Sequence, residues 1–224
     1  MSNEGGLIDQ VGLCGSVVEL SHPLVKHHLT RLRDEATPAA EFRLLIQRLA
    51  AFLSYEATKD LATRPVDVQT PLANAAGDAI CERIALVPIL RAGLGMVDPI
   101  LNLIPQAEVW HLGIYRDEET AMPVEYYSRF PPDRPPDVAL ILDPMLATGG
   151  SVMAALSALR DWGVSTIKIL SVIASRDGLT EVVSRFPSVQ VFVCVIDPIL
   201  NEQKYIVPGL GDAGDRTFNT LPRG

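Results

Sequence analysis

The segment from Val138 to Leu159 constrains the fold more than any other part of the chain. It reads VALILDPMLATGGSVMAALSAL, which is an apolar run, a short loop with two glycines, and then apolar residues at helical spacing. Val138 to Leu142 has the β-branched and aliphatic composition of a strand that is buried on both faces of a parallel sheet. Val152, Leu156 and Leu159 recur at the spacing of a helix. The segment therefore predicts a strand, a loop and a helix in direct succession.

The loop between this strand and this helix has the features of an anion-binding site. Asp143 follows the strand, and residues 147–151 have small side chains, so several backbone N–H groups can turn toward one anionic group. The N-terminus of the helix adds its partial positive charge. An acid for hydroxyl groups directly before a phosphate-binding loop suits a ribose 5-phosphate. Glycine-rich turns are also common in α/β proteins that bind nothing there, and the loop alone leaves that alternative open.

The loop lacks two familiar nucleotide-binding signatures, because no Lys follows the second glycine and the GxGxxG spacing is absent. DPMLATGGS instead resembles the loop that binds phosphoribosyl pyrophosphate (PRPP) in type I phosphoribosyltransferases, in the form found in the uracil phosphoribosyltransferase family. Most type I enzymes have two acids here, whereas Pro144 takes the second position, as in the uracil enzymes. The resemblance implies that PRPP is bound by Asp143, Pro144, Met145, Leu146, Ala147, Thr148, Gly149, Gly150 and Ser151.

Composition restricts the class of protein. With 224 residues, of which 48% are hydrophobic, the chain can form one α/β domain and a small attached lobe. The net charge of −8 argues against binding to nucleic acid or an anionic membrane. Cys14, Cys81 and Cys194 are widely spaced, so neither a disulfide framework nor a metal site is expected. The sequence starts with MSNEGGLIDQ, unlike a signal peptide, and no apolar stretch reaches about 18 residues. We therefore expect a cytoplasmic protein.

Apolar patterns along the chain predict strands that alternate with helices. Residues 1–15 are glycine-rich and are expected to form a loosely ordered extension, followed by a single domain at 16–224. Strands are expected at 17–20, 84–90, 108–115, 138–142, 167–172 and 189–196, with shorter strands and turns at 63–80. Helices are expected at 23–35 with Ser21 as a cap, from Thr37, at 96–104, after Gly150 and at 179–186. Such alternation predicts a right-handed parallel sheet with helices on both faces.

Two arginines follow predicted strands. Arg91 precedes two glycines that let a ligand approach the backbone, and its forked side chain suits pyrophosphate; the alternative is an arginine that caps a surface loop. Arg116 begins a charged run that by itself indicates a solvated face. The segments PILRAG and YRDEET resemble those of the family, which implies that Arg91 and Arg116 bind PRPP and that Arg116 is catalytic. Because strand ends meet at one edge of a parallel sheet, we expect Asp143 beside both arginines.

The segment from Tyr205 to Asp215, YIVPGLGDAGD, exposes much backbone, because it has three glycines in eleven residues. Rigid N–H and C=O groups can match the donors and acceptors of a planar base, although an ordinary surface turn would have a similar composition. The segment closely resembles the family's uracil loop. The resemblance implies uracil-binding positions at Ile206, Gly211, Asp212 and Ala213, and Asp212 also reaches PRPP as a catalytic residue.

Two positions depart from the family pattern. Val207 stands where Ile is usual, and Ser175, Arg176 and Asp177 precede Gly178 where relatives have proline and glutamate.

The residues from 117 to 137 contain five prolines, so we expect an extended arm that either closes over a ligand or contacts a second subunit.

The resemblance spans nearly all of residues 16–220. It implies a type I phosphoribosyltransferase-like fold, which is a parallel sheet flanked by helices with a small hood lobe. It also implies conversion of uracil and PRPP to uridine 5′-monophosphate (UMP) and pyrophosphate in pyrimidine salvage, with Mg²⁺ bound through PRPP. Relatives are homodimers or homotetramers, and some are activated by GTP. Two alternatives stay open from the residues: a phosphoribosyltransferase for another base, and a non-catalytic regulator that senses uridine nucleotides.

Overall fold

The computed structural model describes residues 17–116, 123–128, 131 and 134–220. The expected N-terminal extension at 1–15 therefore lies outside the described residues. So do residues 117–122, 129–130 and 132–133 of the expected arm.

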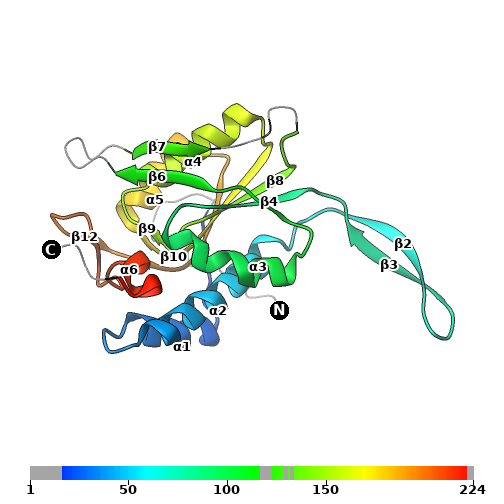
Figure 1. Cartoon of the computed structure of the whole chain (residues 1–224), viewed down its shortest axis with the longest axis horizontal. Coiled ribbons are helices and arrows are strands. Elements are labelled where there is room, and N and C mark those ends of the chain that lie inside the picture. The colour runs from blue at the N-terminus through cyan, green and yellow to red at the C-terminus, as the bar shows by residue number, and fades with distance from the viewer. Residues whose placement is uncertain (1–16, 117–122, 129–130, 132–133, 221–224) are drawn as a thin grey trace, which may run out of the picture.

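The centre of the molecule is a sheet in which every neighbouring pair of strands is parallel, as predicted (Figure 1). Its spatial order is β1-β11-β10-β8-β4-β5, and the short β9 also pairs with β10. The bounds are β1 Val17–Glu19, β4 Ile84–Pro88, β5 Glu108–Val109, β8 Val138–Leu142, β9 Met145–Leu146, β10 Thr166–Ser175 and β11 Gln190–Asp197. Parallel strands of this kind are buried on both faces, which explains their continuous apolar runs.

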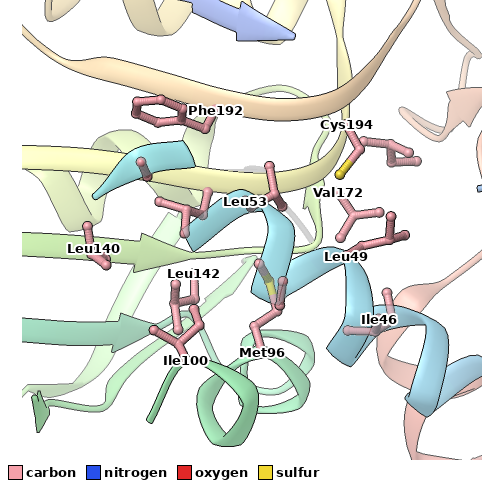
Figure 2. Packing of buried hydrophobic residues seen from close by; sticks show 14 of the residues in the cluster. Ile46, Leu49, Leu53, Met96, Ile100, Leu140, Leu142, Val172, Phe192 and Cys194 are labelled. Atoms are coloured by element: carbon pink, nitrogen blue, oxygen red, sulfur yellow. The ribbon is translucent and has the colours of Figure 1, made fainter. Parts of the chain in front are cut away.

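Successive residues of each strand pack into two different cores. In β8, Leu140 and Leu142 face the helices of one layer, whereas Ala139 and Ile141 face the helices of the other. Figure 2 shows the first core, in which the sheet packs on residues from α2 and α3. That layer consists of α1 Pro23–Arg33, α2 Ala39–Ala57, the short 3-10 helix η2 Ala92–Met96 and α3 Val97–Leu103. The opposite layer consists of α4 Gly150–Trp162 and α5 Arg176–Arg185.

Two hairpins lie outside the central sheet. β2 (Thr63–Gln69) and β3 (Asn74–Ile80) pair only with one another and project away from the body of the molecule (Figure 1). β6 (Leu112–Arg116) pairs antiparallel with β7 (Pro123–Ser128). Residues 63–80 thus form short strands as predicted, but they do not join the main sheet. Part of the expected arm is a β-strand.

The prediction of one strand at 108–115 is wrong. The chain forms β5 beside β4, is interrupted at Trp110 and His111, and resumes as β6, whose strand partner is β7. It stays in register with the β4 segment across the interruption, because Trp110 donates to Leu86 O at 2.9 Å and Leu112 bridges to Ile89. The expected strand is divided because its second half pairs with β7 instead of continuing along β4.

Two predicted helix starts also differ. His22, rather than Ser21, caps α1, because its Nδ1 accepts a hydrogen bond from the Leu24 N–H at 3.1 Å. α5 begins at Arg176, earlier than the predicted residue 179, because Ser175 caps it by accepting from the Gly178 N–H.

The C-terminal part forms a small unit at the carboxyl end of the sheet (Figure 1). It contains β12 (Ile199–Leu200), β13 (Ile206–Val207) and α6 (Ala213–Phe218), with α6 packed on α2 and η2. Within the described ranges, no helix is both long enough and apolar enough to span a membrane.

Candidate active site

A cavity of about 400 Å³ opens at the carboxyl edge of the central sheet. It is bounded by the loops that follow β4 and β8 and by the start of α6. Its lining residues are Ile89, Leu90, Arg91, Ala92, Asp143, Met145, Ala147, Ser151, Gln203, Lys204, Tyr205, Asp212, Ala213 and Gly214. A second cavity, of about 790 Å³, shares Arg91, Tyr205 and Asp212 with the first and also contacts Gly211.

The sheet order explains why these residues meet. β4 and β8 are neighbours, but the chain continues from β4 outward to β5 on one side and from β8 to β10 on the other. The loops after the two strands therefore diverge and leave a crevice between them, which is where open α/β sheets bind ligands. Arg91 comes from one of these loops and Asp143 from the other, as the sequence predicted. The Arg116 backbone ends β6, and its side chain is outside the described part of the structure.

Asp143 is a half-buried carboxylic acid at the end of β8. Burial raises its pKa to about 7, and this effect is opposed only partly by the hydrogen bond that its Oδ1 accepts from the Met145 N–H at 3.2 Å. The group therefore changes its charge near neutral pH. In its ionised form it accepts hydrogen bonds and attracts hydroxyl groups in the cavity.

Residues 143–151, here called the phosphate loop after the ligand expected for them, run into the N-terminus of α4. Gly149 occupies the cap position with a φ of +79°, a conformation that favours glycine, and no side chain in the described ranges caps this helix. The N–H groups of the first helical turn consequently have no intrahelical acceptor. With the dipole of a 13-residue helix behind them, they form a site for one anionic group.

β10 holds the phosphate loop from behind. The Ser171 Oγ accepts a hydrogen bond from the Leu146 N–H at 3.1 Å, and the Ser175 hydroxyl donates to Ala147 O. Gly178 packs so closely on the loop that a Cβ there would lie 2.1 Å from Ala147 O. The Ser175–Gly178 segment, which departs from the family pattern, thus supports the position of the loop backbone.

Arg91 connects the two sides of the cavity. Its Nη2 donates to Asp215 Oδ1 of α6 at 3.0 Å, while its side chain is 57% exposed. Asp212 caps α6 by accepting the Asp215 N–H on its Oδ1 at 2.8 Å. The arginine predicted to bind pyrophosphate and the acid predicted to act at the ribose therefore lie on facing elements.

The segment from Tyr205 to Asp215, here called the base loop after its expected ligand, contacts the phosphate loop directly. The Ala213 N–H lies 3.3 Å from Met145 Sδ, and Gly211, with a φ of +76°, borders the second cavity. Ile206 is only 4% exposed, and its side chain belongs to the core. Any role of Ile206 in binding a base therefore falls to its backbone.

Two lining residues, Gln203 and Lys204, lie outside every segment that the sequence analysis singled out. Lys204 adopts a φ of +66°, which turns the chain into β13. A left-handed lysine has no signature in the sequence, so only the neighbouring glycine-rich loop indicated this region. Among the described residues, no group of three or more His, Cys, Asp or Glu side chains gathers to hold a metal.

Comparisons with known proteins agree on one family. The family model described as uracil phosphoribosyltransferase matches residues 18–220. A uracil phosphoribosyltransferase from Roseiflexus sp. (strain RS-1) is 55% identical over 199 residues, which cover 89% of this chain and 96% of the relative. Another from Desulfitobacterium hafniense (strain DSM 10664 / DCB-2) is 48% identical over 202 residues, covering 90% and 97%. The solved structure of the AQ2163 protein from Aquifex aeolicus has a TM-score of 0.85 at 41% identity, covering 90% and 97%.

The raised pKa of Asp143 predicts how stability depends on pH. Between about pH 4 and 7 the folded protein keeps this proton while the unfolded chain loses it, so the free energy of unfolding falls as pH rises. Asp143→Asn removes this effect. Between pH 5 and pH 8 the variant should gain at most about 3 kcal/mol relative to the original protein, measured by urea unfolding. An equal difference at both pH values would show that the acid ionises freely in the folded state.

Proposed function

The chain belongs to the uracil phosphoribosyltransferase family, and we propose that it binds its two substrates across the cavity between β4, β8 and α6. It is an enzyme of pyrimidine salvage that converts uracil and PRPP to UMP and pyrophosphate. The observation that most supports the proposed site is that one cavity brings together Asp143, Arg91 and Asp212, which come from three separate segments of the chain.

The phosphate loop is the proposed site for the 5-phosphate of PRPP. Its anion is held by the backbone N–H groups from Thr148 to Ser151 at the start of α4, supported by the helix dipole. Asp143 lies at the other end of the loop and binds the ribose hydroxyls. The residues between them, Pro144, Met145, Leu146 and Ala147, shape the loop, and Ser171 and Ser175 fix its backbone.

Arg91 and Arg116 are the proposed partners of the pyrophosphate group. The exposed guanidinium of Arg91 already borders the cavity. Charge builds on pyrophosphate as the bond to the ribose breaks, and groups aimed at such charge commonly supply about 2 to 4 kcal/mol each, roughly 30-fold to 1,000-fold in rate. Mg²⁺ fits this site as a partner of the PRPP oxygens rather than of a protein cage, and it would neutralise further charge on the leaving group.

The reaction follows from this placement. N1 of uracil attacks the anomeric carbon while pyrophosphate departs, through a transition state with oxocarbenium character and no covalent intermediate with the protein. Asp212 is the proposed catalytic carboxylate on the side of the cavity where uracil binds. One of its oxygens accepts the Asp215 N–H, which fixes the carboxylate in place near the ribose, where it orients the base or takes the N1 proton.

The base loop recognises uracil through its backbone in this proposal. Gly211 and Ala213 border the cavities, whereas the side chain of Ile206 is buried. Their N–H and C=O groups do not change rotamer, so the pattern of donors and acceptors is fixed. The sequence identity of 55% and 48% to uracil phosphoribosyltransferases favours an enzyme that acts on uracil. It disfavours the two alternatives, which are an enzyme for a different base and a non-catalytic regulator.

Further properties are proposed from the family alone. We expect a homodimer or homotetramer in the cytoplasm, and the projecting β2–β3 hairpin, most of whose residues are exposed, is consistent with contact to another subunit (Figure 1). Activation by GTP stays a prediction.

Backbone recognition predicts strong discrimination between pyrimidines. Cytosine reverses the donor and acceptor pattern of uracil at N3 and at position 4, which leaves two backbone groups facing like partners. At about 1 to 3 kcal/mol for each group, kcat/KM for cytosine should be at least about 30-fold lower than kcat/KM for uracil. Chromatography of the nucleotides formed from PRPP, Mg²⁺ and each common base measures this ratio. Similar turnover of the two pyrimidines would rule out backbone recognition, and preferred turnover of a purine would rule out the assigned substrate.

The close contact of Gly178 with the phosphate loop gives a second prediction. Gly178→Ala places a methyl group against Ala147 O and must displace the loop, so the KM for PRPP should rise about tenfold or more. Gly77→Ala in β3 is the matched control, because its new Cβ would lie 3.9 Å from the nearest atom, Val66 Cγ2, and its KM should not change. An unchanged KM in a folded Gly178→Ala protein would show that the loop position does not govern PRPP binding.

A further inference from the structure

The base loop is held by an ion pair whose two residues line neither of the two cavities described above. The Arg33 guanidinium donates to Gly209 O at 2.7 Å and forms two hydrogen bonds to Asp197, at 2.6 and 2.8 Å. The same carboxylate accepts the Gly209 N–H at 2.9 Å. Both polar backbone groups of Gly209 are therefore fixed by one pair. The Asp197 side chain is only 4% exposed, which makes such charged hydrogen bonds strong.

A second arginine holds the next residue of the loop. Arg216 donates to Leu210 O at 2.8 Å. It also donates to Leu32 O at 2.9 Å and to Asp34 O at 2.6 Å, and its guanidinium lies 4.3 Å from the centre of the Phe42 ring. The two latter carbonyls are at the C-terminus of α1, where helix carbonyls lack intrahelical partners and have partial negative charge. Arg216 thus joins the loop to the end of a rigid helix.

These contacts determine where the loop's other polar groups point. The Leu210–Gly211 peptide bond is trans, so its carbonyl and its N–H point in opposite directions. Because Arg216 takes the Leu210 carbonyl, the Gly211 N–H points away from this guanidinium, and both Arg216 and Gly211 line the second cavity. A shift of the carbonyl would turn the N–H away from a bound base by the same rotation.

We propose that Arg216 and the Arg33–Asp197 pair are positioning residues for uracil specificity, acting through the backbone of residues 209–211. This inference rests on the proposed role of residues 206–213 in binding the base. Arginine is needed because its planar fork serves several acceptors at once, whereas lysine presents a single ammonium. Loss of the fork should loosen the base loop while the phosphate loop, held by β10, stays in place.

The test compares Arg216→Lys and Arg33→Lys with Arg160→Lys. Arg160 is a matched control on α4, because it also donates to a neighbour, Ser188 Oγ, and also lies over an aromatic ring, that of Phe186, at 4.6 Å. Both loop variants should raise the KM for uracil about tenfold and lower the uracil-to-cytosine ratio of kcat/KM by a similar factor, with the KM for PRPP within about twofold. The control should match the original protein in all three values.

An equal fall in activity toward uracil and cytosine, with the ratio unchanged, would overturn the proposal and indicate a purely structural role. If the original protein made no UMP, the proposed function would fail instead, which is a distinct result. If the loop variants do not fold, hydrogen exchange measured on the original protein tests the proposal instead. The Gly209 amide should exchange slowly without ligand, whereas the Gly211 amide should be slowed by UMP. No effect of UMP on Gly211, or fast exchange at Gly209, contradicts the proposal.

Discussion

Hydrogen bonds to the backbones of the two substrate loops determine the shape of this site. On the phosphate side they come from Ser171 and Ser175 of β10, and on the base side from Arg33 and Arg216. Both loops offer substrates N–H and C=O groups more than side chains. Such groups recognise a ligand only if the chain is held firmly, because a backbone without bulky side chains has little packing of its own. In the proposed site, these hydrogen bonds are what would make the two glycine-rich loops selective.

The parallel sheet brings these two supported loops to a common edge. β8 and β10 place the phosphate loop, and the C-terminal unit places the base loop over the crevice between β8 and β4. Asp143 lies where both meet, and burial there raises its pKa.

The sequence was informative wherever the signal is local. The strand, loop and helix from Val138 onward follow from apolar spacing and two glycines, and the common position of Arg91 and Asp143 follows from a general property of parallel sheets. The interruption at Trp110 and His111 was not predictable, because it depends on a change of strand partner from β4 to β7 rather than on local apolar spacing. Arg33 and Asp197 are 164 positions apart, and nothing in either local segment indicates that they pair. The left-handed conformation of Lys204 likewise depends on its surroundings rather than on its own residue type.

A crystal structure with bound UMP tests most directly whether two backbone segments share one substrate. The account predicts the 5′-phosphate on the N–H groups of Thr148 to Ser151, the ribose hydroxyls on Asp143, and the uracil ring within hydrogen-bond distance of the Gly211 backbone. A base held only by side chains, or a phosphate bound away from the start of α4, would contradict it.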